Sequence, residues 1–250
     1  SLNFLTEEGK SITGLNFSSK SILYLGIILL GSRISFENIL SINHYVIILV
    51  IAAVILTIII SILLLRIFGF QYRFGILIGG AIAICGASAA MAISSVLPKD
   101  EKSNERLTFV VLGVTIISTF CMIFYPIISK YLEMSEISAG IFFGATIHDV
   151  AQVIGAGFTV SEITGETATV IKLFRVTLLF PIVLIISIMS YRLKLINNVD
   201  RKTPLIPYFI IFFILVVIIN SLNLIPTNIK YLLSEMSSWF LLIAIGCLLY

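Results

Sequence analysis

The chain has 250 residues, of which 59% are hydrophobic and only 12% are charged. Its mean hydropathy of +1.13 excludes an ordinary soluble domain and indicates an integral membrane protein. The formal net charge of +3 is spread over short loops, which excludes a dense basic surface for nucleic acid.

The apolar residues come in blocks of about twenty and lack the alternation of a lipid-facing barrel strand. This pattern predicts an all-α fold, a polytopic transmembrane helical bundle. The three cysteines, Cys85, Cys121 and Cys247, lie inside apolar segments without CxxC spacing. They indicate neither a disulfide framework nor a zinc site, and we expect no metal and no cofactor.

The first half of the chain contains three apolar segments of different character. Residues 1–17 read as a lead-in without the pattern of a signal peptide. The run between Lys20 and Arg33 is long enough for a half-helix, or for a span if residues 15–19 are added. His44–Phe68 predicts an uninterrupted scaffold helix. Phe74–Leu97 is rich in Gly, Ala and Ser, which favours close helix packing and a helix break at Cys85–Gly86.

The second half of the chain predicts the remaining spans of a single transmembrane domain covering residues 1–250, with about seven spans and a partial eighth. The last apolar run, Trp239–Tyr250, has 12 residues, too few for a core of about 30 Å. We therefore expect a half-span or a chain cut inside a span. The elements in order are a charged loop Pro98–Arg106, spans Leu107–Ser129, Ile137–Val160 and Glu166–Ser190, a basic loop Tyr191–Thr203, a span Leu205–Leu224, and a last helix from about Ser237.

The distribution of Lys and Arg predicts the orientation, if each segment crosses the membrane once. The bias of nine to five places the loop Tyr191–Thr203 in the cytoplasm of a multi-pass protein of the bacterial inner (plasma) membrane. The two groups are Lys10, Lys20, Arg66, Arg73, Lys130, Arg192, Lys194, Arg201 and Lys202, against Arg33, Lys99, Lys102, Arg106 and Lys230.

The fifth predicted span carries polar side chains at its middle. His148 and Gln152 are four residues apart and share a helix face with small residues, while Asp149 lies about 100° further round. One interpretation is that these groups only hydrogen-bond between helices. The other is a polar substrate site near the centre of the bilayer, because ionisable groups there usually mark a pathway.

The sixth predicted span adds two cations, Lys172 and Arg175, one turn apart. Lys172 is able to reach the membrane surface by extending its side chain. Arg175 lies deeper and needs a carboxylate, carbonyl groups or an anionic substrate. Asp149 is the obvious partner for one cation, and the cation left over suggests an anion site.

The third predicted span supplies the complementary part of that site. If the helix breaks at Cys85–Gly86, the half-helix that follows presents its N–H groups and the Ser88 hydroxyl to an anion at the midplane. The alternative is simple close packing of small residues. A different class of function, an intramembrane enzyme with Cys85 as nucleophile and His148 as base, has weaker support, and we do not expect an enzyme.

Five sequence blocks, spread over nearly the whole chain, look familiar. The blocks are LYLGIILLGSRISFENI (Leu23–Ile39), GGAIAICGASAAMA (Gly79–Ala92), GIFFGATIHDVAQVIGAG (Gly140–Gly157), IKLFRVTLLFP (Ile171–Pro181) and INSLNLIP (Ile219–Pro226). In this order they resemble the blocks of the proposed sulfate exporter family of bacterial inner-membrane proteins. Asp149 stands where a Glu often follows the His in that family.

The resemblance implies a fold beyond what the spacing predicts. That family is grouped with the superfamily of sodium/proton antiporters and bile-acid symporters, which have two inverted repeats and broken helices that cross at the midplane. It implies an inverted-repeat transporter with at least one discontinuous helix, broken at Cys85–Gly86. It also implies that terminal spans are missing, because the family's members are longer at both ends.

Together these observations predict a secondary transporter that moves a small anion (sulfate, sulfite, a related oxyanion or an organosulfonate) by alternating access. The alternative is a cation/proton antiporter in which Asp149 and Lys172 form the exchanging pair. Expected partners are the anion, membrane lipids, protons or sodium as coupling ion, and a second copy in a homodimer. The expected substrate-binding residues are Cys85, Gly86, Ser88, His148, Gln152 and Arg175, with Asp149 and Lys172 as ion pair or coupling groups.

Overall fold

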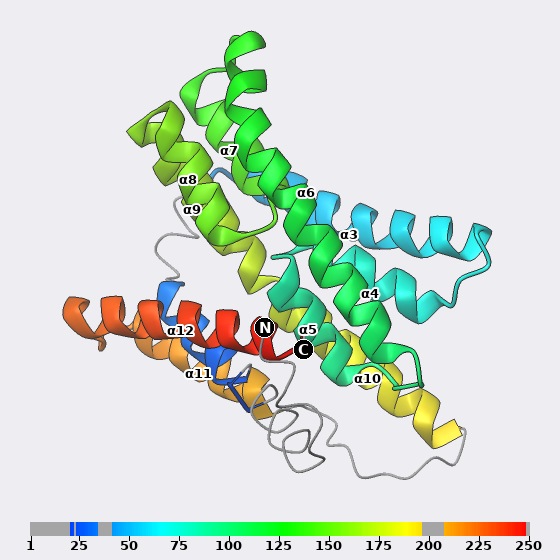
Figure 1. Cartoon of the computed structure of the whole chain (residues 1–250). Helices are drawn as coiled ribbons and strands as arrows, with labels where there is room; N and C mark the ends of the chain where they lie inside the picture. The colour runs from blue at the N-terminus through cyan, green and yellow to red at the C-terminus, as the bar shows by residue number, and fades with distance from the viewer. Residues whose placement is uncertain (1–20, 23, 35–41, 197–207, 249–250) are drawn as a thin grey trace, which may run out of the picture. The chain divides into compact units, whose positions relative to one another are not determined.

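The computed structural model describes residues 21–22, 24–34, 42–196 and 208–248, and all regular structure in these residues is helical (Figure 1). They belong to two compact units, Phe36–Leu205 and the two terminal segments Ser1–Ser35 and Ile206–Tyr250. The helices are η2 (Gly31–Arg33), α3 (His44–Ile67), α4 (Tyr72–Ala83), α5 (Ala87–Val96), α6 (Ser103–Tyr131), α7 (Glu136–Thr146), α8 (Val150–Val160), α9 (Glu162–Thr177), α10 (Leu179–Ile196), α11 (Tyr208–Ser221) and α12 (Thr227–Leu248).

Three helical segments of the larger unit are long and apolar enough to cross a membrane: α3, α6, and the nearly continuous α9–α10 over Glu162–Tyr191. Helix α3 begins where the Asn43 side chain accepts a hydrogen bond from the N–H of Tyr45, the usual role of an N-cap residue. At 24 residues it is about 36 Å long. The other helices of this unit are shorter and pack between or beside these three.

Helices α4 and α5 form a hairpin instead of one crossing. Gly86 has φ = +70°, a backbone conformation that glycine adopts without strain, and the chain reverses there. A Cβ atom added to Gly80 on α4 would overlap Ile93 on α5, so the two helices run back side by side. The prediction that Phe74–Leu97 crosses the membrane once is therefore wrong: small residues here allow two helices of the same segment to approach each other.

Helices α7 and α8 form a second hairpin. Gly140 on α7 faces Thr164 and Thr167 at the start of α9, and Gly157 at the end of α8 faces Gly165. Both outer ends of the hairpin thus lie beside the first turns of α9, and the chain reverses between Thr146 and Val150. The prediction of a single crossing over Ile137–Val160 is also wrong.

The two hairpins approach from opposite ends of α6. The outer ends of the first hairpin lie at the start of α6, where Arg73, Leu97 and Arg106 line one pocket. The second hairpin follows the far end of α6, where the rings of Tyr125 and Phe142 lie 4.7 Å apart. Because α6 has 29 residues and is about 43 Å long, its two ends lie at opposite faces of a membrane. In Figure 1, α5 (teal) joins the lower end of α6 (green), and α7 follows the upper end of α6.

The hairpins change the predicted count of charges. Arg73 lies on the same face as Lys99 and Arg106, since all three line one pocket, so the alternating count of nine to five does not apply. Around α6, Arg73, Lys99, Lys102 and Arg106 lie at its starting end, and Lys130 lies at its far end. Arg66 lies in the last turn of α3, just before α4 begins. This bias still predicts a cytoplasmic side, and it is the face where α6 begins. Most of the loop Tyr191–Thr203 lies outside the described residues.

The smaller unit joins the N-terminal helix, Tyr24–Arg33, to α11 and α12. The Asn220 amide donates to the carbonyl of Ile34 at 2.7 Å, and the Ser237 hydroxyl donates to that of Gly26 at 2.8 Å. Helix α12 begins at Thr227 and has 22 residues, so the prediction of a helix from about Ser237 started ten residues too late. The single-domain prediction for residues 1–250 stays a prediction.

Labelling of single cysteines tests the hairpin topology. In intact bacterial cells, we expect a membrane-impermeant maleimide to label Glu136→Cys from outside. It should reach Gln71→Cys and Glu101→Cys only after permeabilisation, because both ends of the α4–α5 hairpin face the cytoplasm. All three positions are exposed, and the unsubstituted chain sets the background. Opposite accessibility of positions 71 and 101 would restore a single crossing between them.

Candidate functional site

The tips of the two hairpins meet beside the middle of α6. A Cβ atom on Gly86 would lie 3.0 Å from Val114 of α6 and 3.4 Å from the Cβ of His148. The backbone N–H groups of His148 and Asp149 both donate to the Ser118 hydroxyl at 3.2 Å. Ser118 lies about 20 Å from either end of α6. The turns between α4 and α5 and between α7 and α8 therefore share one depth, near the centre of a bilayer.

Lys172 of α9 connects the two tips directly. Its ammonium donates to the carbonyl of Ile84 at 2.8 Å and to that of Ile147 at 2.9 Å. The side chain is completely buried, so it does not extend to the membrane surface. The two carbonyls end α4 and α7, where the helix dipoles are negative, and a cation is stabilised there.

Arg175, one turn further along α9, binds the same two helix ends. It makes five hydrogen bonds, at 2.6 to 3.4 Å, through all three guanidinium nitrogens. The side chain is 3% exposed. Since a guanidinium has five N–H donors, the carbonyls occupy its full donor capacity in this conformation. The accepting carbonyls belong to Ile82, Ala83, Gly144 and Ile147.

Asp149 does not form the expected ion pair with Lys172. Its exposed carboxylate accepts hydrogen bonds from the N–H groups of Ala151 and Gln152 and caps the start of α8. An ion pair of the described residues joins Arg106 and Asp100 instead, at 2.8 Å. The helix end competes for the carboxylate, and the hairpin carbonyls satisfy the cation instead.

Two buried polar atoms of the site have no hydrogen-bond partner: the Nδ1 of His148 and the Oε1 of Gln152. His148 is 7% exposed. The amide nitrogen of Gln152 donates to the Thr119 hydroxyl on α6 at 3.1 Å. Because buried polar groups are usually paired, these two atoms leave hydrogen-bonding capacity for a water molecule, an ion or a ligand.

The remaining predicted residues lie at the first tip. Helix α5 begins after Gly86 without a side-chain cap, and Ser88 is half-buried in its first turn. The thiol of Cys85 is free and buried. In the described part of the chain, no three His, Cys, Asp or Glu side chains gather to hold a metal ion.

The sequence interpretation missed the contribution of α6. Ser118 and Thr119 anchor the second tip, and neither was among the predicted site residues. A signal for them exists: Val114, Ser118 and Cys121 recur at helical spacing and form a buried face in an otherwise lipid-exposed helix. The structure thus brings all eight predicted residues to the two tips or to α9, with roles that differ from those expected.

Comparison with known proteins identifies a family of membrane proteins. The family profile described as conserved hypothetical protein 698 matches residues 2–250. The UPF0324 membrane protein CT0845 of Chlorobaculum tepidum is 45% identical over 247 residues, which cover 98% of this chain and 69% of the relative.

Two further relatives agree. The UPF0324 membrane protein TauZ of Paracoccus denitrificans is 44% identical over 98% of this chain and 73% of its own length. The UPF0324 inner membrane protein YeiH of Escherichia coli is 32% identical over 94% of this chain and 67% of its own length. No solved structure matches. With the three long apolar segments, these relatives place the chain in the bacterial inner membrane.

Removing the Lys172 ammonium tests its structural role. We expect Lys172→Met to lower the melting temperature of the purified, ligand-free protein, with a net loss of about 1–3 kcal/mol. The Ile84 carbonyl loses the ammonium as its donor, and the Ile147 carbonyl keeps only the 3.4 Å hydrogen bond from Arg175. The variant also avoids the cost of burying a charged ammonium, which offsets part of that loss. The exposed Lys130→Met is the control. A normal melting temperature combined with a lost ligand response would instead assign Lys172 to the ligand.

Close packing of α7 on α9 gives a second prediction. A Cβ atom on Gly144 would lie 2.5 Å from the Ala168 carbonyl oxygen and 2.8 Å from the Cβ of Ile171. We expect Gly144→Ala to destabilise the protein by about 1–3 kcal/mol in thermal unfolding. Gly113→Ala is the matched control, since nothing lies within 4 Å of its Cβ position, and it should be neutral or slightly stabilising.

Proposed function

The chain belongs to the conserved hypothetical protein 698 family of membrane proteins, and on this premise we propose that it is a secondary transporter of a small anion. The observation that carries the proposal is the meeting of two broken helical segments at mid-depth, beside buried charged side chains. Non-helical backbone is tolerated at that depth only where protein buries it or where it lines a cavity. Secondary transporters place their binding sites at such breaks.

The anion binds at the first tip in this proposal. The N-terminal end of α5 carries the positive end of a helix dipole and has no side-chain cap. His148, with its unpartnered Nδ1, lies against Gly86 at this point. Gly86, Ser88 and His148 therefore form the anion site, and Cys85 shapes its wall. The resemblance to proposed sulfate exporters selects sulfate, sulfite, a related oxyanion or an organosulfonate as the substrate.

Lys172 and Arg175 have a different role in this proposal from the one expected from the sequence. Seven hydrogen bonds to the hairpin carbonyls occupy the two side chains. They hold the tips in place and supply positive potential to the site without contacting the anion. Alternating access would then move the hairpins relative to α6.

The second tip carries the coupling ion. The Asp149 carboxylate is exposed, the Gln152 Oε1 has no partner, and the Thr119 hydroxyl lies beside Gln152. Oxygen ligands of this kind suit a hard cation, and a carboxylate also carries a proton. The same group favours the alternative function, a cation/proton antiporter. In that alternative Asp149 acts without Lys172, because the two side chains form no ion pair.

The proposal does not include an intramembrane enzyme. In the described part of the chain, Cys85 is a free, buried thiol that makes no hydrogen bond to His148. A nucleophile and its base normally lie within hydrogen-bond reach. Inverted repeats and alternating access of the whole chain, and a homodimer, remain part of the proposal.

Flux through proteoliposomes tests the anion site. The assay uses labelled sulfate or sulfite inside the proteoliposomes and organosulfonates as competitors. We expect His148→Ala to reduce exchange about ten- to hundredfold. This corresponds to the loss of one hydrogen bond to a charged group, about 1.5–3 kcal/mol. Cys85→Ser is the matched control at the same tip and should retain most of the flux. Equal flux of His148→Ala and wild type would remove His148 from the site.

Asp149→Asn separates coupling from folding in the same assay. Asn is as good an N-cap as Asp, so the start of α8 should be retained while the charge is lost. We expect anion flux that no longer responds to a sodium or pH gradient. If wild type instead exchanged sodium for protons without moving any anion, and Asp149→Asn stopped that exchange, the antiporter alternative would replace the proposal.

A further inference from the structure

A basic pocket lies at the face where α4 and α6 begin and α5 ends. It is open to the outside, and its free volume of about 340 Å³ includes open solvent. Three cations line it, one from each of α4, the α5–α6 loop and α6, and none of the described lining residues is acidic. The lining residues are Arg73, Phe74, Leu77, Ser94, Leu97, Pro98, Lys99, Ser103 and Arg106.

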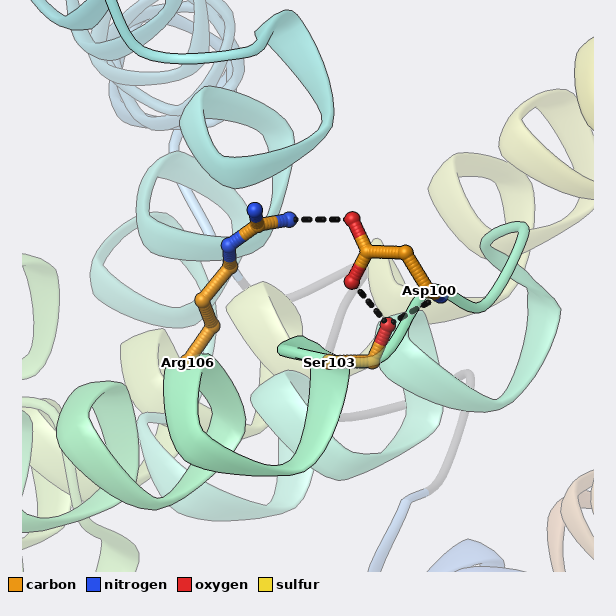
Figure 2. Close-up of polar contacts among 3 residues, drawn as sticks. All are labelled: Asp100, Ser103 and Arg106. Carbon is orange, nitrogen blue, oxygen red and sulfur yellow. Dashed lines mark hydrogen bonds and ion pairs between the residues drawn. The ribbon is translucent and has the colours of Figure 1, made fainter.

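One wall of the pocket is fixed by Asp100. Its carboxylate accepts from Arg106 at 2.8 Å and from the Ser103 hydroxyl at 2.9 Å (Figure 2). The hydrogen bond from Ser103, and then the Arg106 charge, hold the pKa of Asp100 below its usual value. Asp100 is therefore ionised at neutral pH and positions Arg106 at the edge of the pocket.

Arg73, in the first turn of α4, also lines the pocket. Its Nε is buried and has no hydrogen-bond partner. The guanidinium lies 5.8 Å from the centre of the Tyr72 ring. A guanidinium with an unsatisfied buried donor, beside Lys99 and Arg106, matches the oxygens of a phosphate group.

Aromatic side chains place the pocket at the depth of lipid headgroups. Phe74, which lines it, packs against Phe70 at 5.6 Å and against Phe109 at 6.3 Å between ring centres. Phe70 and Phe109 are 52% and 66% exposed. Aromatic rings gather at membrane interfaces. The neighbouring exposed face of α6 is apolar, with Leu112 and Ile116 continuing from Phe109.

We infer that this pocket binds the headgroup phosphate of an anionic phospholipid in the cytoplasmic leaflet. Arg73, Lys99 and Arg106 hold the phosphate, and the acyl chains lie along Phe109, Leu112 and Ile116. A lipid fits better than free phosphate, because the basic pocket continues into an apolar, lipid-facing stripe. Anionic lipids are attracted to basic groups by about 1 kcal/mol per Lys or Arg. The inference does not depend on what the protein transports.

Thermal unfolding of the purified full-length protein in detergent tests the lipid site. A ligand that binds the folded state raises the melting temperature. We expect phosphatidylglycerol to raise it more than phosphatidylcholine of the same chain length. Arg73→Gln should weaken the phosphatidylglycerol response about fivefold in lipid concentration, the change expected for one basic group. Arg66→Gln, an exposed cation on the same face outside the pocket, should leave the response unchanged.

The comparison of ligands in the wild-type protein keeps the test decisive if Arg73→Gln fails to fold. Equal responses to phosphatidylglycerol and phosphatidylcholine would overturn the inference. A full response to inorganic phosphate alone would show a soluble anion as the ligand and would also overturn it. An equal loss in Arg66→Gln and Arg73→Gln would indicate general surface charge instead of this pocket.

Discussion

The larger unit depends on one constraint: backbone carbonyls that end two helices in the middle of a membrane need hydrogen-bond donors. Water cannot supply them at that depth, and each unpaired group there costs several kcal/mol. Lys172 and Arg175 supply the donors, with seven hydrogen bonds to five carbonyls of the two tips. The carbonyls in turn make two buried cations tolerable without a carboxylate. Hairpin tips and cations therefore stabilise each other.

The sequence pointed to residues that the structure brings close together, but it did not predict their hydrogen-bond partners. Composition and apolar block length were sufficient for the membrane-spanning helical class, and Cys85 and Gly86 do lie where α4 gives way to α5. Chain reversal was not predictable in this way, because a segment of about 24 apolar residues fits one long helix or two short ones equally well. Only contacts such as Gly80 against Ile93 distinguish the two cases.

The predicted ion pair between Asp149 and Lys172 is wrong for a physical reason. Charge counting paired Asp149 with Lys172, since a carboxylate is the usual partner of a buried cation. Counting charged side chains leaves out the backbone, although the two ends of a helix carry partial charges of opposite sign. Once the helices break, Asp149 caps the positive end of α8 and Lys172 binds the negative ends of α4 and α7. A sequence alone does not show where helix ends will meet.

Because the chain is synthesised from its N-terminus, the α4–α5 tip is made before Lys172, which donates to it. Lys172 follows its acceptor Ile84 by 88 residues. At about 5–20 residues per second, the first tip waits about 4–18 s on the ribosome before its donor exists. During that time the α4–α5 hairpin has no partner for the carbonyls at its tip, so its final insertion waits for α9. The chain must therefore keep an unfinished hairpin at the membrane face or in the insertion machinery until α9 emerges.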